Sequence, residues 1–554
     1  MTLYILGIGG TGTKCIEAVI HLAAVGLLNK NQFETIKVLF IDPDKSNGSL
    51  ERAKQTLSTY EECINLRQNN TSDKSDKSDN PWMRTKVEIL SSADPWSPLE
   101  SGQTNHKNLG SLFHSSRLQN STTSSKKLGY LFDILYAQEA QTAKLDIGFR
   151  GRPAIGAAVM NHMIDPASEP WKTLIDNLKD DADNNRSPKV CLCGSLFGGT
   201  GASGLPTIGR WVATKLGENR KNVEIASIFM LPYFQFRPPE GEAQAELCAD
   251  PKDFLPNTAA ALHYYHSQAQ IILGSNDNST FNVVYLLGNE KLSQVGDHHL
   301  GHKAQDNPPH FLELYAGLAI RDFIHNSSKL SGEKIKIIGC ENGEVNWRDL
   351  PNLSDKKDEV NEVKALLVNP VKLCYIWTNM AIELRTARKA KIQIAQKLIP
   401  WITLFFKQFF GDDGEVVFQL LRFIGNSKGE KLPNLESEEN DDASEKMNGW
   451  CKDYLKWLLA LQRCDPNVMP VKLFKEDGLN KLLNHVNSNE VDNNLDLKMS
   501  DLIYGENESQ GLFQELRREL NSANKNHDFV KGSGVIGLFE AIYSFIVVLQ
   551  EPNQ

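Results

Sequence analysis

The sequence predicts an α/β protein whose N-terminal part is built on a parallel sheet and whose C-terminal part is mostly helical. Three observations predict this fold class. Short apolar runs alternate with helix-compatible segments through residues 1–305, which is typical of a layered domain with a largely parallel sheet. Two of these runs lead directly into glycine-rich loops. From about residue 364 onward, apolar residues recur mainly at helical spacing, as in "WCKDYLKWLLALQ".

The expected strands are short and apolar, as buried parallel strands usually are. They lie at 3–6, 38–41, 190–192, 225–231 and 281–287. A helix is expected at 13–28, directly after the first strand, because Ile16, Val19 and Ile20 repeat at helical spacing.

Composition predicts loops or disorder in three polar stretches, because they contain too few apolar residues to form a core. They are 68–80, with a repeated DKS, 101–127, and the acidic stretch 426–447.

The composition argues against several classes of protein. At 554 residues, with 40% hydrophobic and 23% charged residues, the chain is ordinary for a globular protein. A net charge of −9 gives no basic footprint, so nucleic acid is not expected as a partner. The most apolar windows, 398–410 and 535–549, are shorter than the roughly 20 residues of a spanning helix, so no membrane span is expected. Nine cysteines without a CxxC pair indicate reduced, mostly buried thiols and a cytoplasmic location.

The first glycine loop, "GIGGTG" at 7–12, follows the first strand. By itself this GxGxxG spacing is the dinucleotide fingerprint, and Asp42 and Asp44 after the second strand would then contact a ribose. The loop is not a P-loop, because Thr13 stands where that motif requires lysine. Lys14, one residue later, either reaches the phosphates or is solvated.

A second glycine loop, "GGTGASG" at 198–204, follows the strand at 190–192. Its glycines allow backbone N–H groups to converge on anionic oxygens, and Thr200 and Ser203 add hydroxyl donors. A dinucleotide site uses one phosphate loop, so a second loop indicates a ligand with more phosphate to hold. For both loops the alternative is structural, with the glycines making tight turns and close helix packing.

The two loops together resemble the tubulin/FtsZ superfamily, whose signature loop has the form GGTGSG or GGGTGTG. The similarity covers somewhat more than half of the chain and is nearest to divergent bacterial tubulin-like proteins. It implies a Rossmann-type nucleotide-binding domain at 1–305, with disordered insertions near 68–80 and 101–127. It further implies a long central helix at 306–326 and a second, activation-like domain at 327–425, which reads here as largely helical. A C-terminal helical region at 448–554 would follow.

The same resemblance assigns residues to a site for GTP or GDP with Mg²⁺. The two loops would hold the phosphates through Gly9, Gly10, Thr11, Gly12, Gly198, Gly199, Thr200, Gly201, Ala202 and Ser203. Gly151 and Arg152, in "GFRGRP", would sense the γ-phosphate, unless Arg150 and Arg152 lie on a solvated surface. Mg²⁺ would be held mainly by phosphates and water.

Three further contacts to the nucleotide are implied by the resemblance. Asp42 and Asp44 would lie near the ribose or a magnesium-bound water, and Glu240 would contact the ribose. Asn307 would contact the guanine base, or would cap the central helix without a ligand.

Hydrolysis in this family needs a carboxylate from the next subunit, presented after the central helix. Here the chain continues as "NSSKLSGEKIKII", without the family's acidic loop. Asp349 is the candidate catalytic carboxylate, with Asp322 second, and the alternative for Asp349 is a turn residue before Pro351. The residues therefore indicate nucleotide binding more directly than GTP hydrolysis.

The resemblance thus implies a GTP-binding protein that assembles head-to-tail into nucleotide-dependent filaments, with GTP hydrolysis, if it occurs, at the subunit interface. The alternative is a non-polymerising nucleotide-binding module that acts as a switch or scaffold for a protein partner through its helical C-terminal region. A Rossmann oxidoreductase would leave the second loop unexplained. The histidine-rich stretch "DHHLGH" at 297–302 lacks further ligands at fixed spacing, so no metal site is assigned to it.

Overall fold

The fold is described from a computed structural model. It describes residues 2–28, 35–70, 81–92, 94–99, 108–120, 123–145, 148–149, 151–237, 250–274, 279–297, 302–326, 334–340, 342–351, 359–389, 401–406, 438–464, 469–487, 495, 497–506, 511–521 and 533–549.

The main sheet has seven strands, all parallel, in the order β3-β2-β1-β4-β5-β7-β9. The strands are β1 (Thr2–Ile8), β2 (Thr35–Ile41), β3 (Lys86–Ile89), β4 (Lys189–Ser195), β5 (Glu224–Met230), β7 (Val283–Leu287) and β9 (Ile335–Ile338). This confirms the predicted parallel sheet, and the five expected apolar runs are β1, β2, β4, β5 and β7. The strands β3 and β9, at the two edges, were not predicted.

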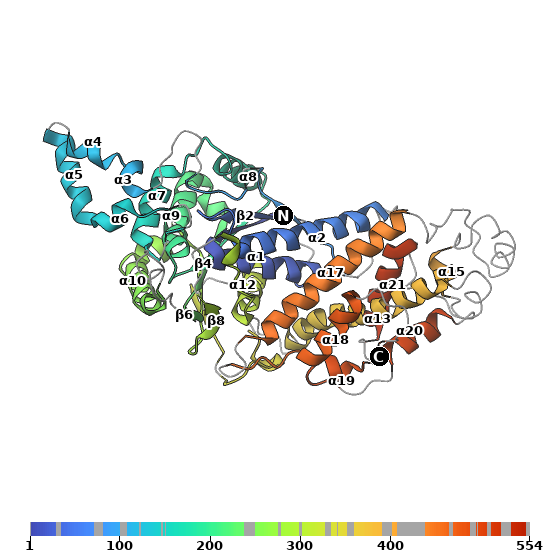
Figure 1. The fold of residues 1–554 in the computed structure, drawn as a ribbon. Helices are drawn as coiled ribbons and strands as arrows, with labels where there is room; N and C mark the ends of the chain where they lie inside the picture. Colours follow the sequence, from blue (N-terminus) through green and yellow to red (C-terminus); the bar gives the residue numbers. More distant parts are fainter. Residues whose placement is uncertain are drawn as a thin grey trace.

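Helices cover both faces of the sheet (Figure 1). One face carries α1 (Gly9–Ala24), α2 (Gly48–Asn70) and α12 (Phe311–Asn326), and the other carries α7 (Pro153–Met163), α8 (Trp171–Asp183), α9 (Gly199–Leu216) and α10 (Phe254–Ser267). Side chains of β1 alternate between the two cores, with Leu3 and Ile5 on the α1 face and Leu6 on the α9 face. Cys191 and Cys193 share one face, as their spacing predicts, with Sγ atoms 3.9 Å apart.

Smaller elements complete this half of the chain. A two-stranded parallel sheet pairs β6 (Phe234–Arg237) with β8 (Ser293–Asp297). The short helical segments are η1 (Gly217–Asn222), η3 (Pro251–Asp253), α11 (Ala269–Leu273), η4 (His302–Ala304) and η6 (Trp347–Asp349). The central helix, expected at 306–326, begins only at Phe311, because the prolines at 308 and 309 disfavour helical backbone before them.

Part of the stretch predicted as disordered forms an arm that projects from the sheet domain (Figure 1). It contains α3 (Leu109–Leu112), α4 (Ser115–Gln119), α5 (Thr123–Leu135) and α6 (Gln138–Thr142). The prediction for 101–127 was therefore wrong over 108–120 and from Thr123 on. Asn108 and Ser111 cap α3 reciprocally, and Gly129 of α5 lets α4 approach closely. At the other insertion, α2 runs to Asn70, and 71–80 lies outside the described residues.

The C-terminal region is mostly helical, as predicted. Its helices are α13 (Glu359–Lys389), α15 (Ile402–Phe405), α17 (Glu438–Gln462), α18 (Glu476–Asn487), α19 (Met499–Leu502), α20 (Leu512–Leu520) and α21 (Gly534–Val548). The disorder expected at 426–447 was wrong from Glu438 on, where acidic residues in the first turn of α17 suit the positive end of a helix. Among the described helices, none is long and apolar enough to cross a membrane.

One continuous core joins the sheet domain to the C-terminal helices. It runs from β1 and α1 through α2 and α12 to α13, α17 and α21, and α2 and α17 lie side by side (Figure 1). β9 pairs with β7 and so belongs to the main sheet, although the sequence placed residues 327–425 in a second domain. The C-terminal helices therefore pack on the sheet domain as an extension of its α1 face.

A buried histidine of α1 makes part of this contact. His21 is 2% exposed, and its ring stacks on Trp457 of α17 with ring centroids 4.6 Å apart. Burial, with a smaller contribution from the positive charge of Arg52, lowers the pKa of His21 to about 3. The ring is therefore neutral in the folded protein at pH 7.

This histidine should make folding stability depend on pH. Between a pKa of about 6.5 in the unfolded chain and about 3 in the folded one, only the unfolded chain binds the proton, so stability falls as pH falls below 6.5. We expect the loss in free energy of unfolding between pH 7.5 and 5.5 to be about 1.4 kcal/mol smaller in His21→Phe than in the wild type. Urea unfolding at both pH values measures it, and equal losses in the two proteins would contradict the assignment.

Candidate functional site

The candidate site lies where the strand order of the main sheet reverses. From β1 the chain proceeds outward to β2 and β3, and from β4 it proceeds the other way to β5 and β7. Ligands of open α/β sheets bind at such a switch point, outside the carboxyl ends of the strands. The two glycine loops follow β1 and β4, so both lie at this point.

The two loops touch each other through their backbones. Gly9 has a positive φ of +73°, and a Cβ built on it would lie 3.2 Å from Cβ of Thr200 and 3.4 Å from N of Gly201. A Cβ on Gly12 would lie only 2.3 Å from the carbonyl oxygen of Cys193 in β4. Gly9 and Gly12 therefore serve close packing, which is the structural role that the sequence left open. Gly10 is different, because nothing approaches its Cβ position closer than the Asn47 amide at 3.9 Å.

A third loop, the segment before α7 that contains Gly151, packs against the second glycine loop. A Cβ on Gly199 would lie 3.1 Å from N of Gly151, whose own φ of +71° suits glycine. Asn257, on α10, donates from Nδ2 to the carbonyl oxygens of Gly151, at 3.1 Å, and Phe197, at 3.4 Å. This asparagine holds the second and third loops together, and no motif in the sequence pointed to it.

Three helices begin at the meeting point of these loops, and none has a side-chain cap. The residues at the N-cap positions of α1, α7 and α9 are Ile8, Arg152 and Gly198, and no first turn contains an acidic residue. The positive ends of three helix dipoles therefore meet without a protein anion to offset them. The Arg152 guanidinium is partly exposed and has no ion pair or hydrogen bond among the described residues. Such an arrangement suits a bound anion. Arg150 lies outside the described residues.

The hydroxyl groups of the two glycine loops differ in whether they are available to a ligand. Thr200 is partly exposed, and its hydroxyl has no hydrogen-bond partner among the described residues. Ser203 is 1% exposed and donates to the carbonyl oxygen of Gly199 at 2.7 Å, inside its own helix. Ala202, on the same helix, and Thr11 of the first loop are both buried. Of the hydroxyls expected at the phosphates, the structure leaves that of Thr200 available.

The two aspartates after β2 lie near the loops, but their carboxylates bond within the protein. Asp42 accepts from the backbone N–H of Asp44 at 2.9 Å, and Asp44 accepts from the N–H groups of Ser46 and His302, at 3.1 and 2.6 Å. Burial, together with the nearby charge of Asp44, raises the pKa of Asp42 to about 7. These side chains shape the turn that places Asn47 beside the first loop. No group of three potential metal ligands occurs among the described residues.

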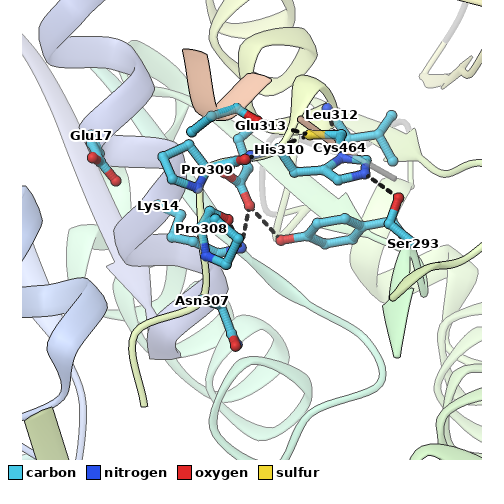
Figure 2. Close-up of polar contacts among 12 residues, drawn as sticks. Lys14, Glu17, Ser293, Asn307, Pro308, Pro309, His310, Leu312, Glu313 and Cys464 are labelled. Atoms are coloured by element: carbon cyan, nitrogen blue, oxygen red, sulfur yellow. Dashed lines mark hydrogen bonds and ion pairs between the residues drawn. The ribbon is translucent and has the colours of Figure 1, made fainter. Parts of the chain in front are cut away.

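The residues expected to contact the base and the ribose, Asn307 and Glu240, are not placed at the glycine loops by any contact among the described residues. Asn307 lies four residues before α12, so it does not cap that helix; His310 occupies the cap position, and its N–H donates to Glu313 at 2.8 Å. Arg52 of α2 donates to the backbone carbonyl of Asn307 at 3.1 Å. The Asn307 side chain points away from the buried cluster around Glu313 (Figure 2). Glu240 lies outside the described residues.

The two carboxylates considered for hydrolysis are engaged locally. Asp349 accepts from the N–H of Asn346 at 2.8 Å and contacts the side-chain amide of Asn342, so it caps its own turn. Asp322 is buried and accepts from the Tyr285 hydroxyl at 2.6 Å. The alternative of a turn residue at Asp349 therefore matches the geometry.

Lys14 neither reaches the loops nor is solvated, so both interpretations of it were wrong. It is 3% exposed, and its Nζ pairs with Oε1 of Glu313 on α12 at 2.5 Å (Figure 2). Glu313 also accepts from the Tyr233 hydroxyl at 2.6 Å. The pair ties the helix that starts in the first loop to the central helix. Cys464, two residues after the end of α17, contacts the carbonyl oxygen of Pro309 at 3.6 Å in the same region.

Comparisons with protein-family models, with curated proteins and with solved structures find no match for this chain. What the structure itself shows is an α/β protein with a seven-stranded parallel sheet, two glycine loops in contact at the switch point of that sheet, and a mostly helical C-terminal region.

The Lys14–Glu313 pair should be costly to break from one side. Removing one partner of a buried ion pair leaves an uncompensated charge and costs about 3–5 kcal/mol. We expect Lys14→Met to lose about that much free energy of unfolding, measured by urea denaturation. The double variant Lys14→Met/Glu313→Gln should recover part of the loss, because glutamine still accepts from Tyr233. A double variant as unstable as the single one would show that the lysine acts through packing alone.

Proposed function

We propose that the protein binds a nucleoside triphosphate with its phosphates across the two glycine loops. The observation that carries this proposal is the meeting of three uncapped helix N-termini, those of α1, α7 and α9, beside the unpaired Arg152. Backbone N–H groups and helix dipoles bind phosphate best where no side chain competes for them. The open surface of Gly10 and the free Thr200 hydroxyl add room and a donor at the same point.

Two arguments support GTP or GDP with Mg²⁺ as the ligand. A dinucleotide site uses one phosphate loop, whereas this site brings two into contact. The strand order of the sheet is shared with dinucleotide-binding folds, so it does not select the base. The choice of guanine therefore rests on the resemblance to the tubulin/FtsZ superfamily. Mg²⁺ would be held by phosphate oxygens and water, since the carboxylates of Asp42 and Asp44 already bond within their turn.

Head-to-tail assembly with GTP hydrolysis is the further step that the resemblance supports. A neighbouring subunit would present a carboxylate to the γ-phosphate, and a repeated head-to-tail contact forms a filament when its rotation does not close. Asp349 would serve this role only if its carboxylate left Asn342 and Asn346.

That engagement of Asp349 favours a second candidate function, a nucleotide switch that does not polymerise. A route from the site to the C-terminal helices supports it. α1 begins at the first loop, pairs with α12 through Lys14 and reaches α17 through His21. In this function the helical C-terminal region would contact a protein partner in a nucleotide-dependent way.

A matched pair of threonine variants tests nucleotide binding. Thr200 lies in the second loop and Thr207 two turns later on the same helix. Loss of one hydrogen bond to a charged phosphate costs about 1.5–3 kcal/mol, so Thr200→Val should bind a fluorescent GTP analogue at least about tenfold more weakly than the wild type. Thr207→Val should stay within about twofold. Equal affinities for the two variants, or no binding by the wild type, would contradict the proposal.

Light scattering on the same proteins separates the two candidate functions. Filament assembly predicts scattering that rises with GTP and Mg²⁺ in the wild type and Thr207→Val but not in Thr200→Val. A nucleotide switch predicts GTP binding with flat scattering in all three proteins.

A further inference from the structure

A cavity of about 680 Å³ lies between α7, α9 and α10, beside the candidate site, with which it shares Ala202, Ser203 and Asn257. Its volume falls within the range of about 300–1,000 Å³ that is usual for small-molecule pockets. The residues that line it come from α7, α9 and α10; they include Ala202 and Ser203 of the second glycine loop and none of the first. We call it the α7–α9–α10 groove.

The sequence leaves this groove open by placing small side chains on all three helices. α7 and α9 run side by side in the same direction. Gly151, just before α7, packs against Gly199, and Gly156, one turn into α7, packs against Ser203 of α9. Beyond their contact, the walls of the groove are narrow side chains, namely Ala154, Ala157, Ala202, Pro206, Ala260 and Ala261. Smooth walls of this kind suit a flat, apolar body.

Aromatic side chains and a buried hydroxyl line the same space. Trp211 and Tyr264 supply ring surfaces for stacking. Tyr265 also lines the groove; it is 9% exposed, and its hydroxyl has no hydrogen-bond partner among the described residues. An unpartnered buried hydroxyl is costly, and a ligand with a polar group would relieve that cost.

The charge of the groove has one sign. Arg210 and Lys215 line it, and neither side chain makes an ion pair or hydrogen bond among the described residues. No acidic residue occurs among the described residues that line the groove. Two unpaired cations beside an apolar, aromatic space favour a ligand that joins a negative group to a planar body.

We propose that the α7–α9–α10 groove binds a small organic anion with a planar aromatic body. The ring lies against the alanine walls and Trp211, and the anionic group is directed to Arg210 and Lys215. The groove adjoins the end of the second glycine loop at Ala202 and Ser203, but its lining includes neither Thr200 nor the first loop, and the proposed ligand does not depend on nucleotide binding there.

The fluorescent anion 8-anilinonaphthalene-1-sulfonate tests this proposal on the native full-length protein, with uncharged N-phenyl-1-naphthylamine as the matched probe. We expect one saturable sulfonate site per chain, with energy transfer from tryptophan. Arg210→Gln/Lys215→Gln should weaken sulfonate binding at least about fivefold and leave the uncharged probe within about twofold. This double variant leaves the core unchanged and so keeps the test valid if a core variant fails to fold.

A steric variant locates the site. Ala157→Trp should weaken binding of both probes at least about tenfold by filling the groove, whereas Ala167→Trp, at an exposed loop position, should not. Circular dichroism and thermal unfolding show whether each variant is folded. Sulfonate binding that survives Ala157→Trp in a folded protein, that ignores the loss of both cations, or that GDP displaces competitively would overturn the proposal.

Discussion

The close approach of α1 to the end of β4 is the constraint on which the site depends. A side chain at Gly12 would collide with the carbonyl oxygen of Cys193, and one at Gly9 would press on Thr200. Only because both positions are glycine can the first turns of α1 and α9 meet at the switch point of the sheet. Gly199 extends the same contact to the third loop, so three helix ends face one space. Close packing of the helices and the proposed ligand binding therefore both require glycine at these positions.

α1 extends the consequences of that contact into the rest of the molecule. Its first turn lies at the loops, its second carries Lys14 to the buried Glu313, and its last turns carry His21 to Trp457. A rigid helix with three such fixed points would transmit a shift at the loops to the central helix and the C-terminal helices together. This geometry gives the nucleotide-switch proposal a physical route, and the buried contact of Cys464 with Pro309 adds a second connection to the same region.

The sequence predicted those features that depend on residues close together in the chain, namely strands and glycine loops. Apolar runs gave five of the seven strands, and glycine spacing located both loops, because each signal lies within a few residues. The role of Lys14 could not be predicted, since Glu313 is remote in sequence and only the fold brings them together. The local hydrogen bond of Ser203 was not anticipated, although a serine inside a helix often bonds to the preceding turn, as it does here to Gly199. The arm was missed because α3 and α4 are short and polar, and because the apolar residues of α5, such as Leu128 and Ile134, begin only after the polar stretch and lie exposed.

Hydrogen–deuterium exchange with and without a non-hydrolysable GTP analogue and Mg²⁺ tests the central claim most directly, because it reports on backbone amides loop by loop. If the two glycine loops hold the phosphates together, exchange should slow in 9–12 and in 198–201 with the same dependence on the concentration of the analogue, and NAD⁺ should leave both unchanged. Protection of the first loop alone, or protection by NAD⁺ in place of the GTP analogue, would contradict the account and return the site to a dinucleotide pocket.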